Sequence, residues 1–190
     1  MNEASKTRDT FTDDEKEKFF SGTGIDIGCG KDPFMPHFAR FDKHNGDANN
    51  IKRFVRQQFD CVVSFHCLEH MYNPYKTIQD WFSLVKKGGY MVIAVPDEDL
   101  YEQGVFPPSR FNRDHKWTFT IQKESSWNLF SINVVDLLKL LDNKEVIKLE
   151  VQDKGYNYKI KNIDQTALYG AMAQILLVVK KHEKGYNNTY

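Results

Sequence analysis

The fold of this chain is best read from ten consecutive residues, Gly24-Ile25-Asp26-Ile27-Gly28-Cys29-Gly30-Lys31-Asp32-Pro33. A short apolar segment carrying the acid Asp26 runs directly into a Gly-x-Gly turn formed by Gly28 and Gly30. Glycine has no Cβ, so the backbone of such a turn can approach a ligand closely. In doubly wound α/β folds this arrangement opens a nucleotide site at the carboxyl end of the first strand.

Two nucleotide-binding motifs are nevertheless excluded. The third glycine of the dinucleotide fingerprint is missing, because Asp32 and Pro33 follow the turn, and the chain has no Gly-Lys-Ser/Thr of a P-loop. The short spacing from Asp42 to Asp47 also argues against NAD as the cofactor. On its own, the Gly-x-Gly turn fits an ordinary strand-to-loop connection equally well.

Composition narrows the remaining classes of protein. The 190 residues suit one domain with a sizeable core, and 26 basic residues balance 26 acidic ones. This neutral balance argues against nucleic acid or an anionic membrane as the main partner. No apolar run reaches membrane-spanning length, and Cys29, Cys61 and Cys67 show neither metal spacing nor a disulfide framework. We therefore expect a cytoplasmic protein with reduced thiols.

The hydrophobic pattern predicts strands alternating with helices, which indicates an open and mostly parallel sheet. Helices are expected at 13–20, 49–57, 74–85 and 132–141, and strands at 25–27, 61–65, 90–95, 145–151 and 173–180. Gly88 and Gly89 are expected to stop the third of these helices.

Three parts of the chain differ in character. We expect a polar, helical segment at 1–20, one domain at 21–181 and a disordered tail at 182–190. Within the domain, Pro33 and Pro36 exclude a long first helix. The irregular stretch 97–130 is of a length that is more often functional than not.

Further motifs follow the glycine turn in a fixed order. They are Phe41-Asp42, Gly46-Asp47-Ala48, Phe59-Asp60-Cys61-Val62-Val63-Ser64, Leu68-Glu69-His70 and Val85-Lys86-Lys87-Gly88-Gly89-Tyr90. This series, over roughly residues 22 to 120, resembles the class I methyltransferases that depend on S-adenosylmethionine (SAM). The resemblance implies a Rossmann-like, doubly wound α/β fold with an antiparallel edge strand, abbreviated between strands 2 and 4. Lys87 stands where the family usually has proline.

The resemblance also implies which residues would hold SAM. Asp42 would accept both ribose hydroxyls, since a carboxylate offers two acceptor oxygens, Asp47 would accept the adenine amino group, and Asp26 would face the ammonium. Asp42 and Asp47 fit equally well as turn formers in an Asp-Lys-His-Asn-Gly loop. The expected cofactor residues are Asp26, Gly28, Gly30, Asp42, Asp47, Ala48, Ser64 and Phe65.

The stretch His66-Cys67-Leu68-Glu69-His70 follows the fourth strand of the family pattern. In the first turn of a helix, His66, Glu69 and His70 would share one face and suit a divalent metal, with His115 as a fourth ligand from the long loop. The pattern resembles small-RNA 3′-terminal 2′-O-methyltransferases, which carry Glu where this chain has His66. That difference favours Mn, Fe, Co or Zn over Mg.

Two alternatives to metal binding stay open. Leu-Glu-His is frequent in metal-free methyltransferases of the broad type 11 group, where His66 or His115 would act as a general base. The same residues would otherwise serve only to buttress the fold.

The stretch Leu84 to Phe130 resembles bacterial methyltransferases that modify surface carbohydrates. Its aromatic and polar side chains suit a sugar or a phosphorylated acceptor, and we select Tyr101, Arg110, Lys116 and Trp117 as acceptor residues. The predicted activity is O-methyl transfer from SAM to a sugar, sugar nucleotide or phosphorylated precursor in polysaccharide biosynthesis, assisted by a metal. The alternatives are a metal-free methyltransferase and a non-catalytic, SAM-binding partner subunit.

Overall fold

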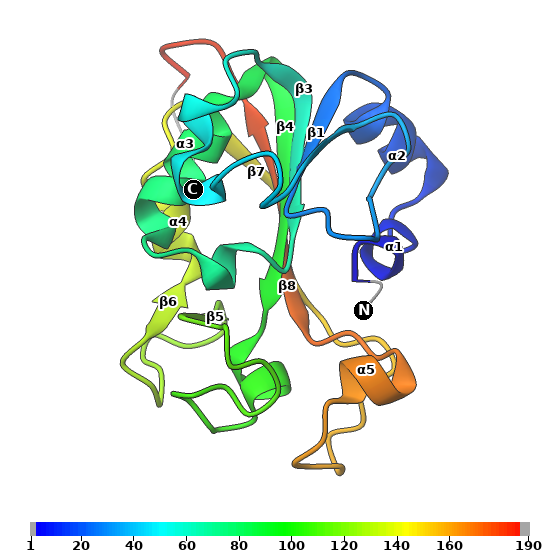
Figure 1. The fold of residues 1–190 in the computed structure, drawn as a ribbon, viewed down its shortest axis with the longest axis vertical. Coiled ribbons are helices and arrows are strands. Elements are labelled where there is room, and N and C mark those ends of the chain that lie inside the picture. Colours follow the sequence, from blue (N-terminus) through cyan, green and yellow to red (C-terminus); the bar gives the residue numbers. More distant parts are fainter. Residues whose placement is uncertain (1–2, 187–190) are drawn as a thin grey trace.

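The computed structural model describes residues 3–186 and centres on a six-stranded sheet (Figure 1). Its strands follow the order β2-β1-β3-β4-β8-β7, in which β1 to β4 are parallel and β8 is antiparallel to both β4 and β7. The bounds are β1 (Gly24–Ile27), β2 (Ala39–Phe41), β3 (Phe59–Phe65), β4 (Val85–Pro96), β7 (Lys144–Gln152) and β8 (Gln174–Lys181). The predicted α/β class, with its antiparallel edge, is confirmed.

Helices cover both faces of this sheet (Figure 1). On one face lie α3 (Pro74–Ser83) and α4 (Val134–Lys139), and on the other lie α1 (Glu3–Arg8) and α2 (Asp13–Phe20). Strand residues alternate between the two cores, so Met91 and Ile93 pack with α3 and α4 while Val92 and Ala94 pack with Phe19 and Phe20 of α2. Because both faces are buried, β3 and β4 each contain a continuous apolar run, Cys61–Val63 in β3 and Met91–Val95 in β4.

Local signals set several helix boundaries. Thr12 and Glu15 form a reciprocal capping box at the start of α2, whose bounds match the predicted helix. Asn73 caps α3, and Pro74 occupies its first turn, where no backbone N–H is needed. The abbreviation after strand β2 is also confirmed, since only the 3₁₀ helix η1 (Ala48–Arg53) separates β2 from β3.

Tertiary contacts move other boundaries away from the prediction. The third helix ends at Ser83 rather than Val85, because Val85 already pairs with Phe59 of β3. Gly88 and Gly89 do not stop the helix but lie in a bulge of β4, between the Val85 pairing and the pairing of Tyr90 with Cys61. Likewise, the predicted helix at 132–141 begins only at Val134, since β6 (Ser131–Asn133) pairs with β5 (Thr118–Thr120).

The carboxyl end of the sheet is covered by the long loop after β4 and by α5 (Gln165–Tyr169), toward the lower end of Figure 1. The loop contains the short helix η3 (Glu98–Glu102) and strand β5. At the other end of the chain, His182 and Gly185 of the predicted tail bond to Asn143, while residues 187–190 lie outside the described part. No helix within residues 3–186 is long and apolar enough to cross a bilayer.

Candidate functional site

The glycine turn after β1 separates two clefts at the carboxyl end of the sheet. Gly28 has a φ of +77°, and a Cβ at this position would lie 2.5 Å from Sγ of Cys67. The position therefore needs glycine for both backbone conformation and space. Gly28 lines both clefts, so the two hollows are neighbours on either side of this residue.

The predicted cofactor residues divide between these clefts. The first cleft contains Asp26, Gly30 and Phe65, and the second contains Asp42, Asp47 and Ala48. Ser64 lines neither of them, because its buried hydroxyl donates to the backbone oxygen of Ile27. Seven of the eight predicted residues thus border one or the other of these two neighbouring clefts.

Asp26 is buried, and one of its oxygens accepts the backbone N–H of Phe34 at 2.7 Å. Burial disfavours the charged carboxylate and raises the pKa of Asp26 to about 7, although the Phe34 bond opposes this shift. A cationic group placed in the first cleft would stabilise the ionised form of this side chain.

The other two acids are held by local bonds. Asp42 accepts the backbone N–H of Gly30 at 3.0 Å, which ties the end of β2 to the glycine turn. Asp47 caps η1 and accepts from Asn49 and Asn50, and these bonds lower its pKa. Asp47 therefore has the turn-forming role that the sequence left open, while its side chain still borders the second cleft.

At the far end of the first cleft, three imidazoles surround Glu69. One oxygen of this carboxylate, Oε1, lies 3.8 Å from Nδ1 of His66, 3.9 Å from Nε2 of His70 and 3.8 Å from Nε2 of His115. Glu69 is fully buried, and neither of its oxygens has a hydrogen-bond partner within the described structure. A buried, unbonded carboxylate is costly unless a cation or a proton compensates it.

Each of these imidazoles turns its other nitrogen toward an acceptor. Nδ1 of His70 donates to the backbone oxygen of Asp114 at 3.1 Å, and Nδ1 of His115 donates to the carboxylate of Glu102 at 2.8 Å. Nε2 of His66 lies 2.7 Å from the side-chain oxygen of Gln174. In the neutral forms of His70 and His115, the nitrogen facing Glu69 therefore carries a lone pair.

Three of these residues form a candidate site for a divalent metal. Ligand atoms of Glu69, His70 and His115 all lie within 4.8 Å of one another, and atoms bound to one ion at about 2.1 Å are roughly 3–4 Å apart. A histidine whose second nitrogen is held by a carboxylate or carbonyl is typical of metal ligands. His66, the fourth predicted ligand, faces Glu69 but lies outside this group of three.

The backbone that brings the histidines to Glu69 is not the α-helical turn that the sequence predicted. Only Leu68–His70 form a single 3₁₀ turn (η2), and His66 precedes it with a left-handed φ of +52°. The shared face at positions i, i+3 and i+4 of an α-helix is therefore absent. Instead, the strained backbone at His66 redirects its side chain, and the loop after β4 brings His115 to the same carboxylate.

Glu102 and Gln174 are functional candidates that sequence reasoning missed. Glu102 lies in η3 within the stretch predicted to be irregular, and Gln174 begins β8. A glutamate 13 residues before a histidine carries no local signal for their contact. Gln174 is 108 residues from His66, so no spacing rule relates them.

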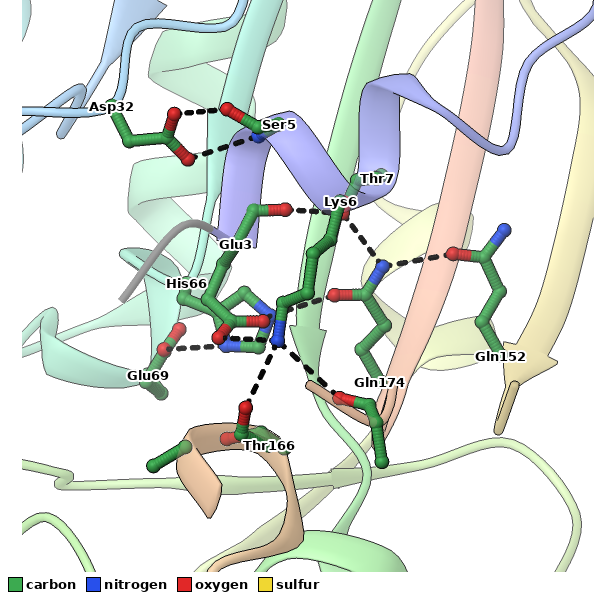
Figure 2. A network of polar contacts seen from close by, with 12 residues as sticks. Glu3, Ser5, Lys6, Thr7, Asp32, His66, Glu69, Gln152, Thr166 and Gln174 are labelled. Carbon is green, nitrogen blue, oxygen red and sulfur yellow. Dashed lines mark hydrogen bonds and ion pairs between the residues drawn. The ribbon is translucent and has the colours of Figure 1, made fainter. Parts of the chain in front are cut away.

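Helix α1 lies in the segment predicted to be polar and helical, in which only the helix at 13–20 was given bounds, and it borders the first cleft (Figure 2). Glu3 and Ala4 line that cleft, and Ser5 binds Asp32 of the glycine turn through both its backbone N–H and its hydroxyl. Lys6 donates to the backbone oxygens of Thr166 and Ala171 near α5. The helix thus bridges the two sides of the cleft.

The predicted acceptor residues are only partly brought together. Tyr101 lines the first cleft, but Arg110 binds Asn162 instead. Lys116 lies over the ring of Tyr72, and Trp117 packs against the core and donates to the backbone oxygen of Met71. In place of these three, Asn112 and Thr166 border the cleft beside Tyr101.

Comparison with known proteins identifies the family to which this chain is similar. Residues 4–131 match the family model of a methyltransferase domain. No curated protein matches the chain.

Solved structures share the fold at low sequence identity. An S-adenosylmethionine-dependent methyltransferase from Clostridium acetobutylicum is 12% identical, with a TM-score of 0.55 and coverage of 96% of this chain and 93% of that one. An arsenic(III) S-adenosylmethionine methyltransferase from Chlamydomonas reinhardtii is 11% identical, with a TM-score of 0.53 and coverage of 96% and 74%. The chain therefore belongs to the methyltransferase domain family and has the fold of S-adenosylmethionine-dependent methyltransferases.

Proposed function

We propose that this protein transfers a methyl group from SAM to an oxygen of a small polar acceptor, with a divalent metal assisting. The observation that carries the proposal is the placement of two neighbouring clefts on either side of Gly28. One cleft presents Asp42 and Asp47, and the other leads from Asp26 to the histidines around Glu69. A cofactor across the glycine turn would therefore point its reactive end toward these histidines.

The chain's own residues would divide the work of binding SAM. Asp42 offers acceptor oxygens for the ribose hydroxyls, and the second cleft receives the adenine beside Asp47 and Ala48. Asp26 faces the methionyl ammonium from the first cleft. When bound, SAM supplies a methyl group activated by its positive sulfonium, and its departure as a neutral thioether needs no acid.

The acceptor hydroxyl, by contrast, needs activation, because its pKa lies far above neutral. Glu69, His70 and His115 would hold a metal, and His66 faces the same carboxylate from the end of β3. A metal there would supply Lewis-acid activation of the hydroxyl. Two imidazole nitrogens in the donor set favour a transition ion over Mg²⁺. Glu102 and the Asp114 carbonyl keep the ligating nitrogens aimed at the site.

The proposed class of acceptor follows from the side chains that line the cleft together with the histidines. Tyr101, Asn112 and Thr166 line the same cleft as the three histidines. An aromatic ring beside amide and hydroxyl groups suits a polyhydroxylated molecule such as a sugar, sugar nucleotide or phosphorylated saccharide precursor. Holding the acceptor oxygen in line with the methyl group supplies much of the remaining rate enhancement.

A metal-free mechanism is the second candidate, and the Glu102–His115 pair favours it specifically. A buried carboxylate that holds Nδ1 of a histidine leaves Nε2 free to accept a proton, as general bases require. In that case His115, or His66 in its place, removes the proton from the acceptor hydroxyl without a metal. The remaining alternative is a SAM-binding subunit without its own activity.

A transfer assay separates these functions. We would incubate the protein with SAM carrying a labelled methyl group and a panel of sugars, sugar nucleotides and sugar phosphates, with and without excess chelator. Transfer that stops with chelator and returns with Mn²⁺ supports the metal-assisted function. Full transfer in chelator supports the general-base mechanism. SAM binding without transfer to any acceptor supports the non-catalytic alternative, and absence of SAM binding contradicts the whole proposal.

A further inference from the structure

Gln174, at the start of β8, connects His66 to two other elements of the fold (Figure 2). Its side chain is buried, with 1% of its surface exposed. One end of the amide lies 2.7 Å from Nε2 of His66, and the other end lies 2.8 Å from both Thr7 of α1 and Gln152 of β7. Which end carries the oxygen decides whether Nε2 of His66 donates or accepts.

Thr7 gives the first indication of the amide orientation. Its hydroxyl has one hydrogen, which it donates to the backbone oxygen of Glu3 at 2.8 Å. Toward Gln174 this hydroxyl can therefore only accept, so the NH₂ group of Gln174 must face it.

Gln152 leads to the same orientation independently. Its own NH₂ group faces the carboxylate of Glu150 at 2.9 Å, and an ionised carboxylate only accepts hydrogen bonds. The oxygen of Gln152 therefore faces Gln174, which again must present its NH₂ group. Two separate anchors thus place the oxygen of Gln174 against His66.

We infer that Gln174 is a positioning residue that keeps a hydrogen on Nε2 of His66, so that Nδ1 is the nitrogen available to the active site. The amide oxygen only accepts, so Nε2 must donate to it in both the neutral and the charged imidazole. Oε2 of Glu3, at 3.9 Å, adds negative charge on the same side of the ring. Nδ1 is left facing Oε1 of Glu69 at 3.8 Å.

This inference deepens the proposed function, on which its catalytic meaning rests. His66 would offer a lone pair on Nδ1, either as an additional metal ligand or as the base of a metal-free reaction. Its Nε2 would be held by Gln174 of β8, and Gln174 is in turn bonded to Thr7 of α1. Docking of α1 and the tautomer of His66 are therefore linked by one amide.

The tautomer can be measured without SAM, metal or acceptor. Long-range ¹H–¹⁵N correlation spectra of the ¹⁵N-labelled protein distinguish the protonated from the unprotonated nitrogen of each of the six histidines. His66→Gln assigns the His66 signals by their loss. We expect a protonated Nε2 and an unprotonated Nδ1 at neutral pH. A protonated Nδ1 with an unprotonated Nε2 would overturn the inference, whatever the result of the transfer assay.

Variants of Gln174 test the cause of the preference. Gln174→Met has similar length but no acceptor, so His66 should populate both tautomers, and any methyl transfer should fall roughly 10–100-fold. Gln174→Glu restores an acceptor and should recover the Nε2–H signal. Gln165→Met is the matched control, since Gln165 is equally buried and its side chain, within residues 3–186, bonds to Asn157 and Ile160 alone. An unchanged His66 spectrum in Gln174→Met, or an equal change in Gln165→Met, would refute the positioning role. The wild-type spectrum decides the tautomer even if Gln174→Met does not fold.

Discussion

Glu102 and His115 are joined by a 2.8 Å hydrogen bond between Oε1 and Nδ1, and both side chains are buried. The bond holds the imidazole so that Nε2 points at Glu69, 3.8 Å away. The spacing of the two residues in the sequence does not predict this contact. The hydrogen bond nevertheless determines which nitrogen of His115 faces the cleft. The relationship makes Glu102 the most direct test of the metal site.

We expect Glu102→Leu to weaken Mn²⁺ binding roughly 10–100-fold, because His115 then loses the acceptor that orients it. Glu102→Gln should retain more affinity, since its amide oxygen still accepts from Nδ1. Titration calorimetry with Mn²⁺ alone measures both variants. Glu124→Gln, an exposed acid of the same loop, serves as the control. Wild-type Mn²⁺ affinity in Glu102→Leu would show that no metal depends on His115.

Asp42→Ala should weaken SAM binding by about 1.5–3 kcal/mol, the cost of losing charge-assisted hydrogen bonds to a diol. The change also frees the N–H of Gly30 from its bond to Asp42. Asp42→Asn keeps one acceptor for that N–H, so a loss shared by both variants points to the ribose contact itself. Calorimetry gives the affinities, and Asp136→Ala on the distant surface of α4 controls for charge removal. Equal affinity in all four proteins would remove Asp42 from the cofactor site.

The raised pKa of Asp26, about 7 against an ordinary 3.8, has opposite effects on stability and on binding. The folded protein holds the proton more tightly than the unfolded chain, so this contribution to stability is full below pH 3.8 and is lost as the pH rises through about 7. Asp26→Asn should therefore stabilise the ligand-free protein by about 2–4 kcal/mol near pH 8 and change little near pH 4.

SAM affinity should show the reverse pattern. The ionised Asp26 attracts the methionyl ammonium, so binding should strengthen as the pH rises through about 7 and lose this dependence in Asp26→Asn. Denaturant unfolding and SAM titrations at several pH values measure the two effects. A SAM affinity in the wild type that does not change across this range would contradict contact between Asp26 and the ammonium.

Trp117→Ala should reduce the free energy of unfolding by about 2–4 kcal/mol, because the indole packs against the core and bonds to Met71. Trp117→Phe keeps most of the apolar contact and should lose less. SAM affinity should be unchanged in whatever fraction is folded, since Trp117 does not line either cleft. A variant with normal stability but impaired acceptor use would instead support the acceptor role predicted from sequence.

Many of the strands and helices could be predicted from patterns among neighbouring residues. The strand before Gly28, the capping box at Thr12 and Glu15, and the continuous apolar run of β8 each depend on neighbouring residues. The predicted start of the fourth helix at Ile132 was wrong, because β6 pairs with a strand more than ten residues earlier, and pairing overrides local preference. Residues 1–20 were predicted as a helical segment, but the separate bounds of α1 were not, because this helix is held by bonds to the distant residues Asp32, Thr166 and Ala171.

The sequence alone decided the α/β class, the glycine turn and seven of the residues that border the two clefts, since periodicity and turn chemistry act over a few residues. Only the tertiary structure decided which nitrogen each histidine presents to Glu69. His70 depends on Asp114, His115 on Glu102 and His66 on Gln174, at separations of 44, 13 and 108 residues. Such hydrogen bonds exist only once folding closes the intervening loops, and no local pattern encodes their direction.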